Sequence, residues 1–108
     1  MNLENNGNEL RHPGIILLED YLKPIGLSQN KLARLMNVDP SRVSLIINKK
    51  RGVSGDTDLR LARVLGTRKG FWLNLQKKYD LRQAVLDIST AELRRIKPFQ
   101  KQDKEALI

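Results

Sequence analysis

Hydrophobic residues along this chain recur mostly every three or four positions, the spacing of one face of an α-helix. Between the repeating segments lie residues that typically begin or end helices. A first helix is predicted over 13–22, because Pro13 suits a first helical turn and the pair Lys23-Pro24 disfavours continuation. Residues 1–11 are rich in Asn and have no apolar period, so they are expected to form a flexible arm.

Two helices joined by a tight turn are predicted over 28–36 and 40–48. Ser28 can cap the first of them by accepting a hydrogen bond from the backbone. Asn37 tolerates the left-handed conformation that reverses the chain, and Asp39-Pro40 supplies a cap followed by proline at the first helical position. A helix pair with this connection is a helix-turn-helix motif.

A fourth and a fifth helix are predicted after the loop at 49–52. Ser54 can cap the fourth helix, and Gly66 is the usual residue to end it. Thr67 is expected to open the fifth helix. Its apolar residues recur at helical spacing, which indicates a core or dimer-interface role rather than base stacking: Phe71, Trp72, Leu75 and Tyr79.

The C-terminal part has a weaker pattern. Ser89 and Glu92 have capping-box spacing, which predicts a short helix before Lys97-Pro98, and the last ten residues are expected to fray. The pattern as a whole predicts an all-α fold, with one domain over 12–86 and an extension over 87–108 for dimerisation or partner binding.

The predicted helix-turn-helix has an inward and an outward face. Ala33 is expected at the closest crossing of the two helices. The inward positions are Leu32, Leu35, Val38, Val43 and Ile46. The outward positions, which are candidates for contacts with DNA bases, are Ser41, Arg42, Ser44, Leu45 and Asn48. Such a helix fits the major groove, where hydroxyls and a guanidinium can bond base edges and Leu45 can contact a thymine methyl.

Charge supports a polyanionic partner. The chain has a net charge of +8, and residues 28–70 alone carry ten basic and three acidic residues, a net charge of +7. Candidates for phosphate contacts are Gln29, Lys49, Lys50, Arg51, Arg68 and Lys69. Arg68 and Lys69 are expected at a helix N-terminus, where the dipole disfavours cations unless an anion binds. A solvated basic face without a ligand is the alternative.

Other classes of function find little support. The chain has no Cys and a single His, so neither a metal site nor a cofactor is expected. It has no apolar stretch long enough to cross a bilayer and no secretory signal, which predicts a cytoplasmic protein with no membrane partner. A nuclease using His12 with Glu19 or Asp20 is conceivable, but no activated nucleophile pair is present, so we expect no enzyme.

Residues 12–81 resemble the HigA-type antitoxins, a branch of the phage-repressor-like helix-turn-helix proteins. The resemblance is carried by His12-Pro13-Gly14, Pro24-Ile25-Gly26-Leu27-Ser28-Gln29, the segment 48–52, Leu61-Ala62-Arg63 and Phe71-Trp72-Leu73-Asn74-Leu75-Gln76. It implies a five-helix lambda-repressor-like domain with a short C-terminal extension, homodimerisation, repression of the protein's own promoter and neutralisation of a HigB/RelE-type mRNA-cleaving toxin.

The chain departs from this family in its first helix, where Ile15 and Leu18 are apolar and family members often carry charged residues. Ile15, Leu18 and Leu22 form an apolar stripe separate from that of Leu17 and Tyr21. Either both stripes serve the core, or the extra stripe, in the net acidic segment 1–27, binds a basic toxin or a second subunit.

Two further alternatives remain open. Helix-turn-helix proteins of this kind include stand-alone regulators without a toxin, and a small basic RNase gene beside this one would distinguish the two. A structural adaptor is the other alternative, which failure to bind any duplex at low salt would favour.

Overall fold

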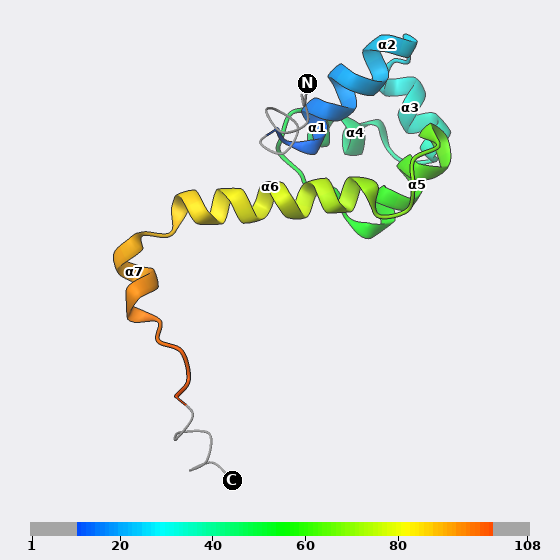
Figure 1. The fold of residues 1–108 in the computed structure, drawn as a ribbon. Coiled ribbons are helices and arrows are strands. Elements are labelled where there is room, and N and C mark those ends of the chain that lie inside the picture. The colour runs from blue at the N-terminus through cyan, green and yellow to red at the C-terminus, as the bar shows by residue number, and fades with distance from the viewer. Residues whose placement is uncertain (1–10, 101–108) are drawn as a thin grey trace, which may run out of the picture.

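The computed structural model describes residues 11–100, and every regular element in this range is helical, which confirms the all-α fold. The elements in order are α1 (Pro13–Ile16), the π-helical segment η2 (Leu17–Leu22), α2 (Lys23–Ile25), α3 (Gln29–Met36), α4 (Pro40–Ile47), α5 (Gly55–Leu65), α6 (Phe71–Asp87) and α7 (Thr90–Arg95) (Figure 1). The arm expected at 1–11 and the fraying expected in the last ten residues fall almost wholly outside the described residues. No helix within 11–100 is both long and apolar enough to cross a membrane.

The first helix runs further than the sequence predicts. Instead of stopping at residue 22, the helical path continues through Pro24 to Ile25 and ends at Gly26, which has a φ of 68°. The backbone N–H of Lys23 bonds to the carbonyl of Leu18, five residues back, so the preceding turn is wider than an α-helical turn. We attribute the tolerance of Pro24 to this widening, because an α-helical turn would press the proline ring against the carbonyl four residues before it.

The helix-turn-helix forms as predicted. The Ser28 hydroxyl accepts a hydrogen bond from the Lys31 N–H at 3.1 Å, and the Asp39 carboxylate accepts one from the Ser41 N–H at 2.8 Å. Asn37 takes the left-handed conformation, with a φ of 59°. These three residues set where α3 begins and ends and where α4 begins.

The core lies where α1, α3, α4 and α5 meet the first half of α6. Gly14 lets α1 touch the backbone of α4, because a Cβ at this position would lie 1.9 Å from the carbonyl oxygen of Ile46. The buried apolar residues are Ile16, Leu17, Leu22, Leu32, Ala33, Met36, Val43, Ile46, Ile47, Val53, Leu61 and Trp72. Leu35, predicted to face inward, is 52% exposed, because the inner face of α3 is filled by Leu32, Ala33 and Met36.

The start of α6 also differs from the prediction. Thr67 does not open a helix; its hydroxyl accepts a hydrogen bond from the Trp72 indole N–H at 3.0 Å, and α6 begins at Phe71. The cap comes from another helix. Buried Asp58 of α5 accepts hydrogen bonds from the N–H groups of Gly70, Trp72 and Leu73 at 2.6, 2.8 and 3.1 Å.

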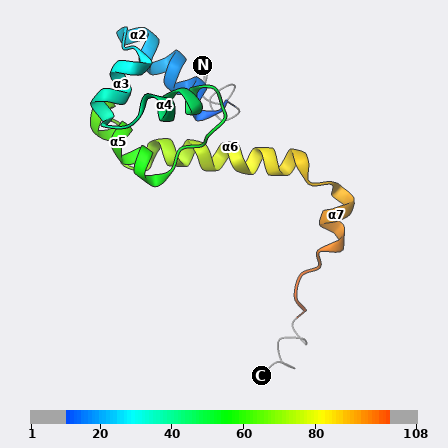
Figure 2. The same cartoon turned by 180° about the vertical axis from the view of Figure 1, so that it is seen from behind.

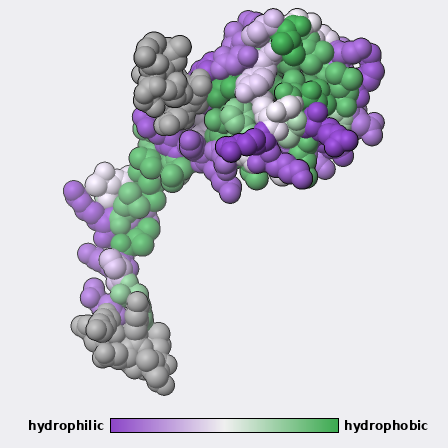
Figure 3. Space-filling model, turned by 45° about the vertical axis from the view of Figure 1, so that its right-hand side comes forward, coloured by the Kyte–Doolittle hydropathy of each residue, from purple (hydrophilic) through white to green (hydrophobic). Residues whose placement is uncertain are grey.

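The second half of α6 leaves the domain and continues into α7, forming a projecting arm (Figures 1 and 2). All residues from 80 to 100 are exposed, and the molecule measures 60 × 33 × 26 Å. Hydrophobic surface follows this arm (Figure 3). The exposed apolar side chains of the arm are Leu81, Val85, Leu86, Ile88, Leu93, Ile96 and Phe99.

Candidate nucleic-acid interface

One face of α4 is open to solvent, as the sequence predicts. Val43, Ile46 and Ile47 are buried beneath the helix. On the other side Ser41 and Leu45 are exposed and Ser44 is half-buried, and Asn48 is exposed at the C-terminal end. The Asn48 amide donates hydrogen bonds to the Ser44 carbonyl and hydroxyl oxygens at 2.9 and 3.3 Å. The exposed face therefore presents small polar groups and one leucine, within the dimensions of a major groove.

Arg42 is half-buried and its side chain turns toward α5, so its role as a base contact stays a prediction. Its guanidinium bonds the Asp56 carboxylate of α5 at 2.7 Å, and its side chain is only 26% exposed. The sequence pattern groups Arg42 with Ser41 on the outward face of the helix. The long Arg42 side chain turns toward α5 because it bonds the carboxylate of Asp56, fourteen positions later in the chain.

A run of three exposed cations follows α4 directly. We call Lys49, Lys50 and Arg51 the basic loop. The chain reverses at Lys49, whose φ is 63°, and the Lys50 N–H returns to the Leu45 carbonyl at 2.8 Å. A left-handed conformation costs a residue with a side chain about 1 kcal/mol, so lysine holds this position at some strain.

The basic loop is fastened to α6 by Gln76, a residue that sequence reasoning missed. The Gln76 carbonyl oxygen accepts a hydrogen bond from the Val53 N–H at 2.9 Å, and its amide donates one to the Asp80 carboxylate at 2.9 Å. Gln76 is buried. The available signal was its position four residues after Trp72, on the face of the helix that packs into the core.

The remaining phosphate candidates lie apart from the basic loop in sequence. Gln29 is half-buried at the first residue of α3. Arg68 and Lys69 are exposed, but they stand in the turn before α6 rather than in its first helical turn, so their predicted place at a helix start is wrong. The cause is the late start of α6, which Asp58 fixes by binding the Gly70 N–H.

The apolar stripe of the first helix divides between core and surface. Leu22 is 1% exposed and belongs to the core, so the prediction that it contacts a partner is wrong. Its side chain fills the space between the first helix and the rest of the domain, which the helical wheel alone does not reveal. Ile15 and Leu18 are half-buried, and Leu18 packs against the core.

The His12 side chain makes contacts within the fold. Its Nδ1 accepts a hydrogen bond from the Gly14 N–H at 2.9 Å, and its ring packs edge-on against Tyr79 with centroids 4.9 Å apart. Burial lowers the pKa of His12 below its ordinary value of 6.5; Asp80 opposes this shift and Lys49 adds to it.

The carboxylates considered with His12 for nuclease chemistry are engaged elsewhere. Asp20 pairs with Arg11 at 2.7 Å, and Glu19 pairs with Lys23 at 2.9 Å. Within residues 11–100 no group of three His, Cys, Asp or Glu residues is arranged to hold a metal ion.

The chain is similar in sequence to a known family and to known proteins. A family profile described as Helix-turn-helix matches residues 18–72. The chain is 50% identical over 76 residues to Virulence-associated protein I of Dichelobacter nodosus, covering 70% of each protein. It is 42% identical over 80 residues to the Uncharacterized HTH-type transcriptional regulator YbaQ of Escherichia coli K12, covering 74% of this chain and 71% of that protein.

Two solved structures extend the similarity to three dimensions. The Pseudomonas aeruginosa antitoxin HigA with the higBA promoter superimposes with a TM-score of 0.78 at 34% identity, covering 84% of this chain and 99% of that one. A second structure from Pseudomonas aeruginosa, of a protein in complex with its operator DNA (18 bp), gives a TM-score of 0.77 at 35% identity, covering 82% of this chain and 96% of that one. The similarity thus spans most of the chain.

Proposed function

Because this chain belongs to the helix-turn-helix family, we propose that it is an antitoxin and autorepressor that binds operator DNA and neutralises a HigB/RelE-type mRNA-cleaving toxin. The family is a non-enzymatic one. The observation that carries the DNA-binding part is the open face of α4 followed directly by the basic loop. A helix of this kind fits the major groove while the cations bind phosphates on its flank.

The proposed contacts with bases and with phosphates come from different residues of this surface. Ser41, Ser44, Leu45 and Asn48 are the proposed base contacts. The basic loop, Gln29, Arg68 and Lys69 are the proposed phosphate contacts. Solved relatives with promoter or operator DNA support DNA binding by this chain.

We assign homodimerisation to the arm. Leu81 and Val85 are 67% and 63% exposed, and with Lys78, Arg82 and Leu86 they line a shallow hollow along α6. A second copy of the arm would cover this surface, and two copies related by a two-fold axis suit a palindromic operator with half-sites roughly 34 Å apart. The toxin would contact the half-buried Ile15 and Leu18 beside the acidic side chains of η2.

Binding of fluorescent DNA containing the chain's own promoter tests the proposal. Polarisation titrations should give tighter binding to the promoter than to a scrambled duplex, and the affinity should fall steeply with salt through counterion release. Equal affinity for both duplexes would contradict the repressor function.

Self-association has its own test. Leu81→Glu with Val85→Glu should give a folded monomer in light scattering, whereas Gln83→Glu on the same helix should stay dimeric. A dimer in the double variant would exclude the arm as the interface.

The toxin part is tested by co-expression with the adjacent RNase gene. The wild-type chain should restore growth, whereas Ile15→Glu with Leu18→Glu should bind the promoter without restoring growth. The alternative is a stand-alone regulator, which the similarity to a protein named only as a transcriptional regulator favours. Absence of any adjacent RNase gene would support that alternative.

A further inference from the structure

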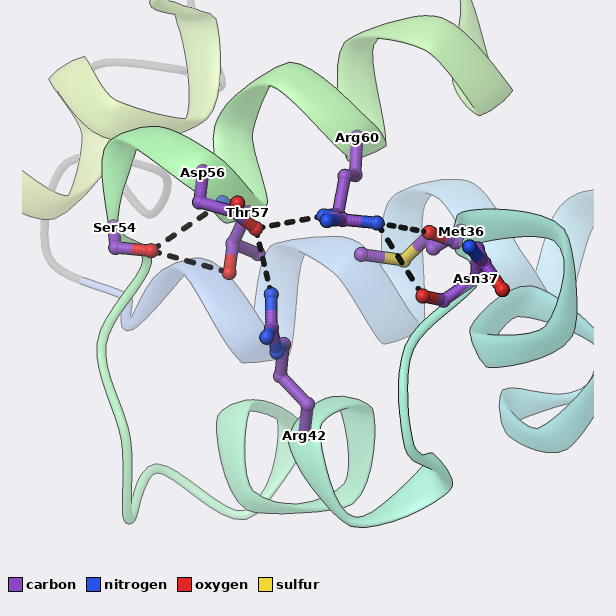
Figure 4. Close-up of polar contacts among 7 residues, drawn as sticks. All are labelled: Met36, Asn37, Arg42, Ser54, Asp56, Thr57 and Arg60. Atoms are coloured by element: carbon purple, nitrogen blue, oxygen red, sulfur yellow. Dashed lines mark hydrogen bonds and ion pairs between the residues drawn. The ribbon is translucent and has the colours of Figure 1, made fainter.

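Three charged side chains link α3 and α4, the two helices of the helix-turn-helix, to α5 (Figure 4). The Asp56 carboxylate oxygen Oδ1 accepts hydrogen bonds from Arg42 Nη1 and from Arg60 Nε, both at 2.7 Å. The other end of the Arg60 guanidinium donates from Nη1 to the carbonyl oxygens of Met36 and Asn37 at 2.8 and 3.3 Å. We call Arg42, Asp56 and Arg60 the clamp.

Each member of the clamp is placed where helix electrostatics favour it. Asp56 lies in the first turn of α5, where a carboxylate is stabilised by the helix dipole. Arg60 donates to carbonyls at the C-terminal end of α3, where a cation is stabilised. Hydrogen bonds from Arg60 and from Arg42 lower the pKa of Asp56 below its ordinary value. The Asp56 carboxylate therefore keeps its charge to a lower pH than an isolated aspartate does.

The clamp restricts the orientation of the helices more than it adds to the free energy of unfolding. The side chain of Asp56 is 57% exposed, and ion pairs this open to solvent contribute little to stability. The planar Arg60 guanidinium has fixed donor directions, so its bonds restrict how the end of α3 lies against α5. Arg42 extends the same restriction to α4.

We propose that Arg42 and Asp56 are positioning residues, which set the angle of α4 against α3 and α5 and so align Ser41 and Leu45 with the bases. This inference rests on the proposed DNA-binding function. The bond from Arg42 Nη1 holds the guanidinium against Asp56 of α5, and the Asp56 charge offsets its attraction to phosphate. In this geometry Arg42 would act through the helix that carries it.

The test compares Arg42→Ala, Asp56→Ala and the double variant. Each protein is titrated with the operator, a scrambled duplex and operators altered at single base pairs. Each single variant should weaken operator binding by roughly five- to tenfold and lower the ratio of operator to scrambled affinity, and the double variant should be no weaker than Asp56→Ala alone, because that change already removes the pair with Arg42. The loss should spread over the half-site.

The opposite role for Arg42 predicts a different pattern. If Arg42 reads a base, Arg42→Ala abolishes preference at one base pair, and Asp56→Ala keeps or improves affinity because it frees the guanidinium and removes a negative charge. That result would overturn the proposal. Additive losses in the double variant would overturn it too.

Two controls keep the outcomes separate. Thermal unfolding followed by circular dichroism establishes that each variant is folded at the binding temperature. If Asp56→Ala unfolds, Asp56→Asn, which removes the charge but keeps an acceptor oxygen, should give a smaller loss in the same direction. A purely structural role would change the unfolding temperature and leave the affinity ratio of the folded protein intact. Absence of operator preference in the wild-type chain would instead refute the proposed function itself.

Discussion

The side-chain carbonyl of Gln76 accepts a hydrogen bond from the backbone N–H of Val53 at 2.9 Å, and this bond fastens the loop after α4 to the middle of α6. Asp80, one turn further along α6, holds the Gln76 amide in the orientation that the bond requires. The helix that carries the arm therefore also supports the basic loop.

Replacing Gln76 by leucine should weaken DNA binding without changing base preference. The buried Val53 N–H would lose its partner, at a cost of about 1–3 kcal/mol, and the basic loop would no longer be held in place. Titrations should show operator and scrambled duplexes weakened by similar factors. Gln83→Leu, the same change at an exposed position of α6, is the control and should leave binding unchanged. An unchanged affinity in the Gln76 variant would show that the bond does not support the basic loop.

Gly14→Ala should destabilise the domain although alanine is the better helix former. The new Cβ would lie 1.9 Å from the Ile46 carbonyl oxygen, so α1 and α4 must separate. Urea denaturation should show a loss of about 1–3 kcal/mol or more, the range for overpacking. Gly55→Ala at the start of α5 meets no atom within 4 Å and should stabilise by about 0.4–1 kcal/mol. Equal effects of the two changes would contradict the close contact.

Asp58→Ala should loosen the start of α6. The change leaves the N–H groups of Gly70, Trp72 and Leu73 without their shared acceptor, at an expected cost of about 2–4 kcal/mol. Trp72 fluorescence reports the transition directly, because this is the single tryptophan of the chain. The matched control is Asp87→Ala at the exposed end of α6, which should unfold like the wild type.

The stability of the domain should depend on pH through His12. Its pKa in the folded chain is below 6.5, so between that pKa and about pH 6.5 the unfolded chain binds more protons. The free energy of unfolding is therefore complete above about pH 6.5 and falls as the pH drops toward the folded pKa. Protonated Nδ1 can no longer accept the Gly14 N–H.

His12→Asn isolates this effect, because asparagine can accept the same hydrogen bond but does not titrate. Urea denaturation at a series of pH values should give a flatter profile for the variant below about pH 6.5. The chain has a single His, so the difference between the two profiles belongs to this residue. Parallel profiles would show that His12 has the same pKa in the folded and unfolded chains.

Local chemistry explains why so much of the helix-turn-helix could be predicted. Ser28, Asn37 and Asp39 act on backbone groups within three residues of themselves, so sequence spacing is enough to place them. The same holds for Ser54 and Ser89, which accept hydrogen bonds from Thr57 and Glu92 at 3.3 and 2.9 Å. The all-α fold follows from the elements that these residues delimit.

The features that sequence reasoning missed depend on distant partners. Arg42 turns toward a carboxylate 14 residues away, and Gln76 bonds a backbone group 23 residues away. The late start of α6 has the same origin, because its cap is Asp58 on another helix and Thr67 bonds Trp72 instead. The packing of α5 against α6 brings Asp58 to the start of α6.

Lys49 stands where glycine would adopt the backbone conformation with less strain. A library selected for thermal stability alone should therefore enrich Lys49→Gly, whereas selection for repression should keep the lysine. Selecting this protein for stability alone would then replace Lys49 and weaken the affinity for DNA. Residue 49 is the one to hold fixed when such variants are designed.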